Sequence, residues 1–311
     1  MKAVVFGYHT MGCLGFEALL AHGFEVAAVL THRDDPGEEV WWDSLAARAA
    51  ARGVPVYFPE SAGDPAVRDL VASYEPDFLF SFYYRFMLPP AILALAPRGA
   101  LNLHGSLLPR YRGRAPVNWV LVEGQTETGV SLHYMVEKPD AGDLVDQERV
   151  AIEALDTAFT LYGKLERAAQ RLLDRALPAL RDGTAKAVPL DLAQGSYRGG
   201  RKPADGRIDW SWSARRIYDL VRAVTHPYPG AFTTWRGRRL LVWWALPVAE
   251  PSGASAAEPG TVTAAGAEGV TVAAGDGGVR LVTLQLEGQP ELPACSLALA
   301  AELAPGERLG S

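Results

Sequence analysis

The sequence predicts an α/β protein, with a Rossmann-like, mostly parallel sheet in its N-terminal part and a small β-barrel in its C-terminal part. In the first half, short apolar stretches typical of strands alternate with longer stretches of helical periodicity. This βαβ rhythm indicates a parallel sheet with helices on both faces. In the second half, short strand candidates are separated by turns rich in glycine, proline and alanine, which is typical of a small barrel. We place the domain boundary between residues 203 and 204.

Apolar periodicity predicts the individual elements of both parts. In the N-terminal part we expect strands at 3–6, 26–30, 78–80, 100–103, 130–136 and 144–152, and helices at 11–21, 42–51 and 157–177. A linker at 195–206, rich in glycine, leads into a helix at 213–224 and then into short strands at 232–234, 239–244, 260–262, 270–273 and 279–286. The stretch 249–259 is of low complexity and is predicted to be a loop.

Composition is consistent with a cytoplasmic enzyme. The chain has 311 residues, 49% of them hydrophobic, which is enough for a substantial core in two domains. A formal charge of −6 argues against a nucleic-acid platform. Cys13 and Cys295 are too few for a disulfide framework and have no metal-ligand spacing, so we predict no metal site. No apolar run predicts a membrane span or a signal anchor, and no feature predicts an oligomeric state.

The glycines after the first predicted strand are a weak signal. Gly7, Gly12 and Gly15 resemble a spaced glycine fingerprint, but their order is not the dinucleotide pattern. No ribose-binding acid is clearly placed after the second strand. The sequence therefore argues against a nicotinamide cofactor, although the turn after the first strand can still help to seat a ligand.

The stretch 102–109 combines polar groups that suit acyl transfer to an amine. Strand alternation places Asn102, His104 and Ser106 on one face, with Leu101 and Leu103 on the other. When an amine attacks a formyl carbon, the carbonyl oxygen gathers negative charge and the nitrogen must lose a proton. The site therefore needs a fixed donor and a base.

Asn102 is the candidate donor and His104 the candidate base. A carboxylate hydrogen-bonded to the far nitrogen of the imidazole would hold its tautomer. The candidate for this role is Asp140, which lies in the turn between two predicted strands. The alternative is that His104 is a buried structural histidine and Asn102 a strand-end cap.

A basic loop follows the polar stretch. Arg110, Arg112 and Arg114 precede Pro116, which is a favourable first residue of a helix, so the loop is expected to present guanidinium groups to an anion. A nucleotide-sugar pyrophosphate or the glutamate tail of a folate would suit it. An ordinary basic surface loop is the alternative.

These residues resemble a known family. Asn102, the run 104–109 and Asp140 within 140–143 look like the active-site signature of enzymes that take a formyl group from 10-formyltetrahydrofolate. The runs 207–210 and 222–232 resemble the second, OB-like domain of that family. Four further runs are most similar to the branch that formylates UDP-4-amino-4-deoxy-L-arabinose, a step in lipid A modification: 8–15, 35–38, 81–85 and 111–122.

The resemblance implies roles for particular residues. Asn102 would stabilise the oxyanion, His104 would move protons and Asp140 would tune the histidine. The folate would be held by a loop, an arginine and a turn, which here are Phe86, Met87, Leu88, Arg114, Val136, Glu137, Lys138, Pro139 and Asp140. For the sugar nucleotide we expect contacts from Arg110, Arg112, Tyr83 and Trp119.

Other functions stay open at this point. A related enzyme formylates methionyl-tRNA, but the acidic balance and the sugar-branch runs argue against that substrate. Another amino sugar is a further possibility. A non-catalytic folate- or nucleotide-binding module is disfavoured, since a binding protein has no need for a positioned base.

Overall fold

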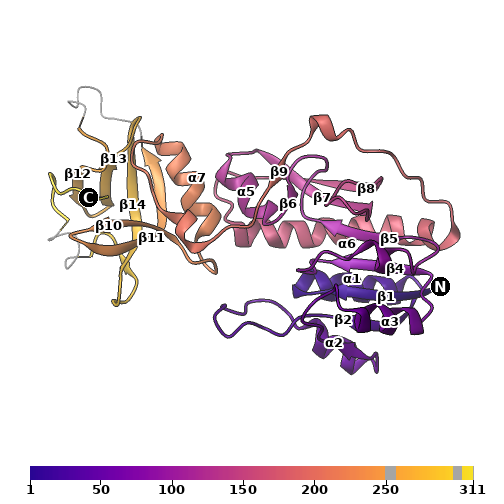
Figure 1. The fold of residues 1–311 in the computed structure, drawn as a ribbon. Coiled ribbons are helices and arrows are strands. Elements are labelled where there is room, and N and C mark those ends of the chain that lie inside the picture. Colours follow the sequence, from indigo (N-terminus) through magenta and orange to yellow (C-terminus); the bar gives the residue numbers. More distant parts are fainter. Residues whose placement is uncertain (249–256, 297–302, 311) are drawn as a thin grey trace. The chain divides into compact units, whose positions relative to one another are not determined.

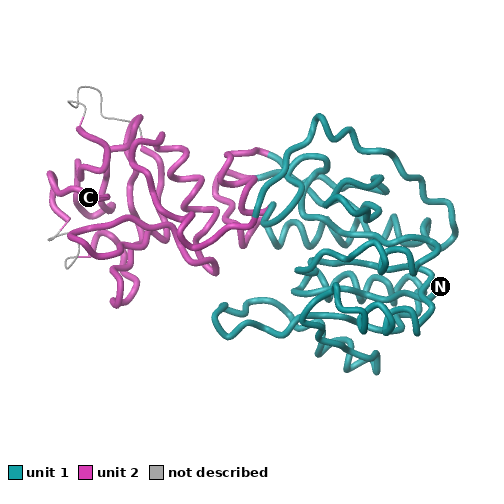
Figure 2. Tube along the Cα trace, in the orientation of Figure 1, with its two compact units in different colours: residues 1–116, 127–152, 162–199 teal, residues 117–126, 153–161, 200–311 magenta. Residues whose placement is uncertain are grey.

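The computed structural model describes residues 1–248, 257–296 and 303–310, which form two compact units (Figures 1 and 2). Unit 1 comprises residues 1–116, 127–152 and 162–199, and unit 2 comprises 117–126, 153–161 and 200–311. Each unit is built around its own sheet. No helix of the described residues is long and apolar enough to span a bilayer.

Unit 1 contains a seven-stranded sheet with the order β3-β2-β1-β4-β5-β7-β8. The strands are β1 (Lys2–Gly7), β2 (Glu25–Leu30), β3 (Val56–Tyr57), β4 (Phe78–Phe82), β5 (Ala100–His104), β7 (Glu127–Tyr134) and β8 (Leu144–Ala151). The first five are parallel, whereas β7 and β8 are antiparallel to their neighbours. This order confirms the predicted Rossmann-like, mostly parallel sheet. A small parallel pair, β6 (Arg112–Gly113) and β9 (Tyr197–Arg198), lies beside it in the same unit.

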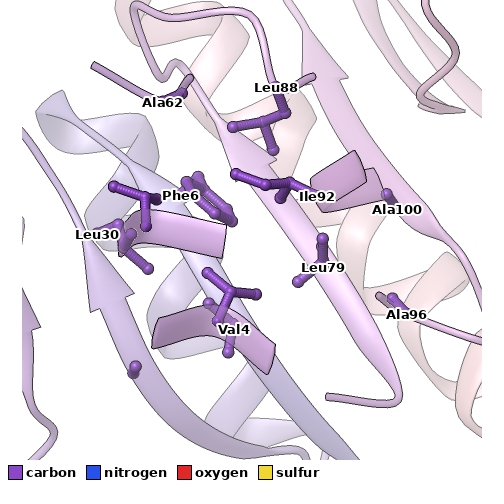
Figure 3. Packing of buried hydrophobic residues seen from close by; sticks show 12 residues of the cluster. Val4, Phe6, Leu30, Ala62, Leu79, Leu88, Ile92, Ala96 and Ala100 are labelled. Carbon is purple, nitrogen blue, oxygen red and sulfur yellow. The ribbon is translucent and has the colours of Figure 1, made fainter. Parts of the chain in front are cut away.

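Helices cover both faces of this sheet. They are α1 (His9–Ala21), α2 (Leu45–Ala51), α3 (Pro65–Ser73), α4 (Pro90–Leu93) and α6 (Ala158–Asp182), of which 162–182 belong to unit 1. On one face, Val4, Phe6 and Leu79 pack with residues of α3 and α4 (Figure 3). Phe82 projects to the opposite face, where its ring lies against Gly15 of α1. Strand alternation thus supplies both halves of the core.

Unit 2 contains an antiparallel sheet with the order β10-β11-β14-β13-β12, to which β15 is added beside β14. Its elements are α5 (Pro116–Val122), α7 (Ala214–Val224), β10 (Ala231–Trp235), β11 (Arg238–Val248), β12 (Val262–Gly266), β13 (Gly269–Ala273), β14 (Gly278–Leu286) and β15 (Leu292–Pro293). The amide of Leu309 donates to Gly260 and that of Gly310 to Thr234, so the C-terminal segment connects the two outer parts of the sheet. An OB-like barrel stays a prediction for this unit.

Several predicted bounds were wrong, for identifiable reasons. The helix expected at 42–51 begins only at Leu45, because the Ser44 side chain caps it by accepting from the amide of Ala47. The helix expected to end at residue 177 continues to Asp182 through Pro178, since the buried Leu180 packs beyond the proline.

The C-terminal part and the connections differ in smaller ways. β12 begins at Val262 and not at 260, and the linker expected at 195–206 contains β9 and a short 3-10 turn at Pro203–Gly206. The strands β3 and β15 and the helices α3 and α4 were not predicted. Most of the predicted low-complexity loop, residues 249–256, lies outside the described residues.

Candidate active site

The end of β5 positions the two central side chains. β5 is flanked by β4 and β7, and its residues Asn102 and His104 are two apart, so they lie on one face of the sheet. His104 is 6% exposed. Ser106, expected on the same face, lies just beyond the strand, where its hydroxyl donates to the carbonyl of Arg110 over 2.7 Å. Ser106 therefore holds the loop that follows.

Asp140 reaches these two residues from the turn between β7 and β8. Its Oδ2 lies 3.6 Å from Nδ1 of His104, and its Oδ1 accepts from Nδ2 of Asn102 over 3.4 Å. The amide of Gly113 also donates to Oδ2 over 2.8 Å. Asp140 has φ 49°, and at Gly142 a Cβ would lie 2.0 Å from the carbonyl oxygen of Tyr134. The structure thus brings together the three residues expected from the sequence, with Asp140 reaching the two residues of β5 from a tight turn.

The imidazole of His104 is held from two sides. Nε2 donates to the carbonyl of Tyr111 over 2.8 Å, so a neutral ring carries its proton there. Nδ1, the nitrogen that can take up a proton, faces Asp140. The sequence-based expectation was a carboxylate on the far nitrogen. The structure places the carboxylate beside the basic nitrogen and a backbone carbonyl on the far one.

The electrostatics of the site keep Asp140 ionised. Burial by itself would raise its pKa. The charge of His104, His133, whose Nε2 lies 3.5 Å from Oδ1, and the Gly113 amide outweigh burial and hold the pKa of this carboxyl well below its usual range. An ionised carboxylate beside Nδ1 stabilises the imidazolium form of His104. The arrangement suits a base that becomes positively charged during a reaction.

Sequence reasoning missed one member of this group, His133. It lies directly opposite Asn102 in the β5–β7 pair, and its Nε2 is 3.2 Å from Nδ2 of Asn102. Its Nδ1 donates to the carbonyl of Tyr134 over 2.8 Å, so Nε2 of the neutral ring is an acceptor for the amide. His133 therefore fixes the orientation of the Asn102 amide, because only the NH₂ end can donate to Nε2. Only the strand register, which the sequence did not reveal, could have identified it.

Replacing His133 by alanine is expected to lower kcat on the order of 10-fold to 100-fold, with little change in either KM, because Asn102 loses the acceptor that orients it. The conservative variant His133→Gln keeps an acceptor and should recover part of the loss. Steady-state kinetics of both variants would check this. An unchanged kcat in His133→Ala would show that Asn102 is oriented without it.

The residues expected to hold a folate lie on three segments of unit 1. Phe86 and Met87 are exposed, at 37% and 57%, whereas Leu88 is buried in the sheet core (Figure 3). The turn Val136, Glu137, Lys138 and Pro139 is exposed or half-buried and leads directly into Asp140. Arg114 is exposed, and its amide donates to the carbonyl of Arg198. Of these segments, the turn 136–139 borders the trio directly in sequence, at Asp140, and Leu88 has a packing role.

The residues expected to contact the sugar nucleotide have different environments. Arg110 forms an ion pair with Glu127 at 3.2 Å, and Arg112 is buried, with an Nε that has no partner among the described residues. Tyr83 has φ 58° and packs over Gly105, where a Cβ would lie 2.3 Å from its hydroxyl. Trp119 belongs to unit 2, where the guanidinium of Arg201 lies 4.7 Å from its ring centre. The structure therefore groups only Arg110, Arg112 and Tyr83 in the unit that carries Asp140.

Comparison with known protein families decides the identity of the fold. Residues 1–177 match the model of the formyl transferase family, and residues 201–300 match the model of the formyl transferase C-terminal domain. The chain belongs to the formyl transferase family. Within the described residues of this formyltransferase, no group of three or more His, Cys, Asp or Glu side chains could hold a metal ion.

Solved structures share the fold of this formyltransferase at low sequence identity. An N-formyltransferase from Helicobacter canadensis, in complex with folinic acid and dTDP-3-aminofucose, has a TM-score of 0.68 at 17% identity, over 90% of this chain and 98% of the other. WlaRD, a sugar 3N-formyl transferase studied with dTDP and 5-N-formyl-THF, has a TM-score of 0.69 at 18% identity, over 93% and 99%.

A third similar structure is a larger protein. A variant of HypX from Aquifex aeolicus has a TM-score of 0.63 at 19% identity, over 94% of this chain and 46% of that protein. The formyltransferase therefore spans about half the length of HypX. All three comparisons show a shared fold.

Proposed function

We propose that this formyltransferase moves a formyl group from 10-formyltetrahydrofolate to the amine of a nucleotide-linked amino sugar, most specifically UDP-4-amino-4-deoxy-L-arabinose. The observation that carries the proposal is the meeting of Asn102, His104 and Asp140 within 3.6 Å at the end of β5. A fixed amide donor, a base and an ionised carboxylate are the groups that acyl transfer to an amine requires. The sugar and folate ligands of the two N-formyltransferase structures support the substrate class.

Each residue of the trio has one task in the proposed reaction. The sugar amine attacks the formyl carbon, and an N–H of the Asn102 side chain stabilises the oxyanion. This is the N–H that faces Asp140, because its hydrogen bond to Asp140 is long, at 3.4 Å, and can be given up. Nδ1 of His104 takes the proton that the amine loses and passes it to the folate nitrogen as the carbon–nitrogen bond breaks. Asp140 supports the imidazolium throughout. The products are the formamide and tetrahydrofolate.

The surrounding loops would bind the two substrates. The loop at 86–88, Arg114 and the turn at 136–140 would hold the folate, and the exposed Arg114 suits its glutamate carboxylates. Arg110, Arg112, Tyr83 and Trp119 would contact the sugar nucleotide. In this proposal residues 1–203 form the catalytic domain, residues 204–311 an OB-like domain, and the enzyme works in the cytoplasm.

Formyl transfer to the sugar nucleotide is the expected activity. With 10-formyltetrahydrofolate as donor, UDP-4-amino-4-deoxy-L-arabinose should give tetrahydrofolate release that depends on both substrates, whereas methionyl-tRNA should give none. The release of tetrahydrofolate can be followed directly, and the product checked by mass. Transfer to methionyl-tRNA alone would contradict the proposal. Transfer only to a different amino sugar would retain the chemistry and change the acceptor.

A further inference from the structure

A pocket of about 270 Å³ lies at the carboxyl ends of β1, β2 and β3, and no member of the catalytic trio lines it. Tyr8 follows β1, Phe58 follows β3, and the segment Thr31, His32, Arg33 and Asp34 follows β2. Open α/β sheets bind ligands at the carboxyl ends of their strands, at the point where the strand order reverses direction. Here the order reverses at β1, which lies between β2 and β4.

The carboxylate of Asp34 is fixed in this pocket by one of its two oxygens. Its Oδ1 accepts from the hydroxyl of Tyr8 over 2.7 Å and from Nε1 of Trp42 over 3.2 Å. Trp42 in turn stacks on His9, with ring centres 3.7 Å apart. No hydrogen bond within the described part of the chain ends on Oδ2 of Asp34. The pocket therefore presents an oriented acceptor with one free oxygen.

Two other lining groups offer donors. Nε2 of His32 accepts from the amide of Arg85 over 3.0 Å, and burial, followed by the charge of Arg85, lowers the pKa of His32 to about 4. The ring is therefore neutral at pH 7 and carries its proton on Nδ1. The guanidinium of Arg33 lies 4.5 Å from the ring centre of Phe58 and forms no ion pair among the described residues. A cation without an acidic partner, beside an aromatic ring, suits a phosphorylated ligand.

We propose that this pocket binds the ribonucleoside diphosphate part of the acceptor, with the free Oδ2 of Asp34 accepting a hydrogen bond from the ribose 2′-hydroxyl and Arg33 facing the phosphates. The inference rests on the proposed function and specifies its nucleotide as a ribonucleotide. A carboxylate after the second strand of a Rossmann-like sheet is well placed to bind a ribose hydroxyl. In the structure, Asp34 is a candidate for the ribose-binding acid after the second strand that could not be located from the sequence.

The glycines after β1 have packing roles and do not indicate a dinucleotide. A Cβ at Gly7 would lie 2.7 Å from a methyl group of Leu45, and one at Gly12 would lie 3.1 Å from it. A Cβ at Gly15 would lie 2.4 Å from the ring of Phe82. Neighbouring side chains therefore explain these glycines, without a phosphate approaching the backbone.

The position of the pocket fits the length of the substrate. In the sheet order, β2 is separated from β5 by three strand steps, or about 14 Å at 4.8 Å per step. A ribose, a diphosphate and a sugar ring can span that distance. A ribose at Asp34 would thus leave the attached sugar within reach of the end of β5, which carries His104.

The test compares UDP with dUDP, which lacks the 2′-hydroxyl, by calorimetric binding without folate or amino sugar. The wild-type protein should bind UDP about tenfold more tightly, since a hydrogen bond to a charged acceptor is lost with dUDP. In Asp34→Asn this preference should fall to about twofold, because the variant keeps an acceptor for Tyr8 and Trp42 and loses the anionic oxygen. Glu39→Gln removes the same charge from an exposed residue of the same loop and should keep the preference.

Several outcomes would overturn the inference. These are equal binding of UDP and dUDP by the wild-type protein, no measurable binding of UDP, an unchanged preference in Asp34→Asn, and a preference lost equally in Glu39→Gln. Tighter binding of NAD⁺ than of UDP would assign the pocket to a dinucleotide and would also overturn it. If the UDP preference depends on Asp34 but no formyl transfer occurs, the proposed function fails while the pocket assignment stands.

Discussion

Replacing His104 by alanine is expected to lower kcat by about 10²-fold to 10⁴-fold, with little change in folate affinity. The imidazole would act on the proton that the amine loses in the transition state, and its ring is buried between Tyr111 and Asp140, so it contributes little surface for ground-state binding. Steady-state kinetics combined with a folate binding measurement would check the prediction.

A matched control separates this effect from a general loss of structure. His22, at the end of α1, pairs with Asp174 and lies outside the trio, so His22→Ala should keep nearly full activity. Normal turnover in His104→Ala would remove this residue from the chemistry. A parallel loss of kcat and folate affinity would instead indicate a structural role.

Asp140→Asn is expected to lower kcat by about 10-fold to 100-fold and to shift the pH–rate profile, because the variant removes the ionised carboxylate from the site. The pKa of Asp140 is held well below its usual range, so the wild-type carboxylate stays charged at every assay pH. The variant removes that charge from beside Nδ1, so the imidazolium that forms during the reaction loses its ionised partner. Asparagine tolerates the φ of 49° and can still accept from the amide of Gly113.

The control for this variant is Asp143→Asn, three residues further along the chain. Asp143 is exposed, and only its backbone carbonyl contributes to the turn, by accepting from the amide of Tyr134. Its pH–rate profile should match that of the wild-type protein. A profile that does not move in Asp140→Asn would show that Asp140 does not tune His104.

The local features that the sequence predicted are those with a strong short-range signal. The alternation around Asn102 and His104 gave a strand whose polar face carries both residues, and the turn at Asp140 was expected between two strands. The repeated pattern of strands and helices predicted the mostly parallel sheet. Burial on alternate positions produces these patterns directly, so they are visible without any knowledge of distant contacts.

The features that the sequence did not predict depend on distant parts of the chain. His133 joins the site only because β7 pairs with β5 in a register that places it opposite Asn102. Asp34 becomes an oriented acceptor through Tyr8, which is 26 residues away along the chain. The tautomer of His104 is set by the carbonyl of Tyr111, and backbone carbonyls leave no trace in a sequence pattern.

The most direct test of the account is a double-mutant cycle on single-turnover formyl transfer, using wild-type protein, His104→Ala, Asp140→Asn and the double variant, with both substrates saturating. If Asp140 acts through His104, the double variant should be no slower than His104→Ala alone, because the carboxylate then has no imidazolium to support. Rate losses that multiply would contradict the account, since they would show that the carboxylate and the imidazole act independently.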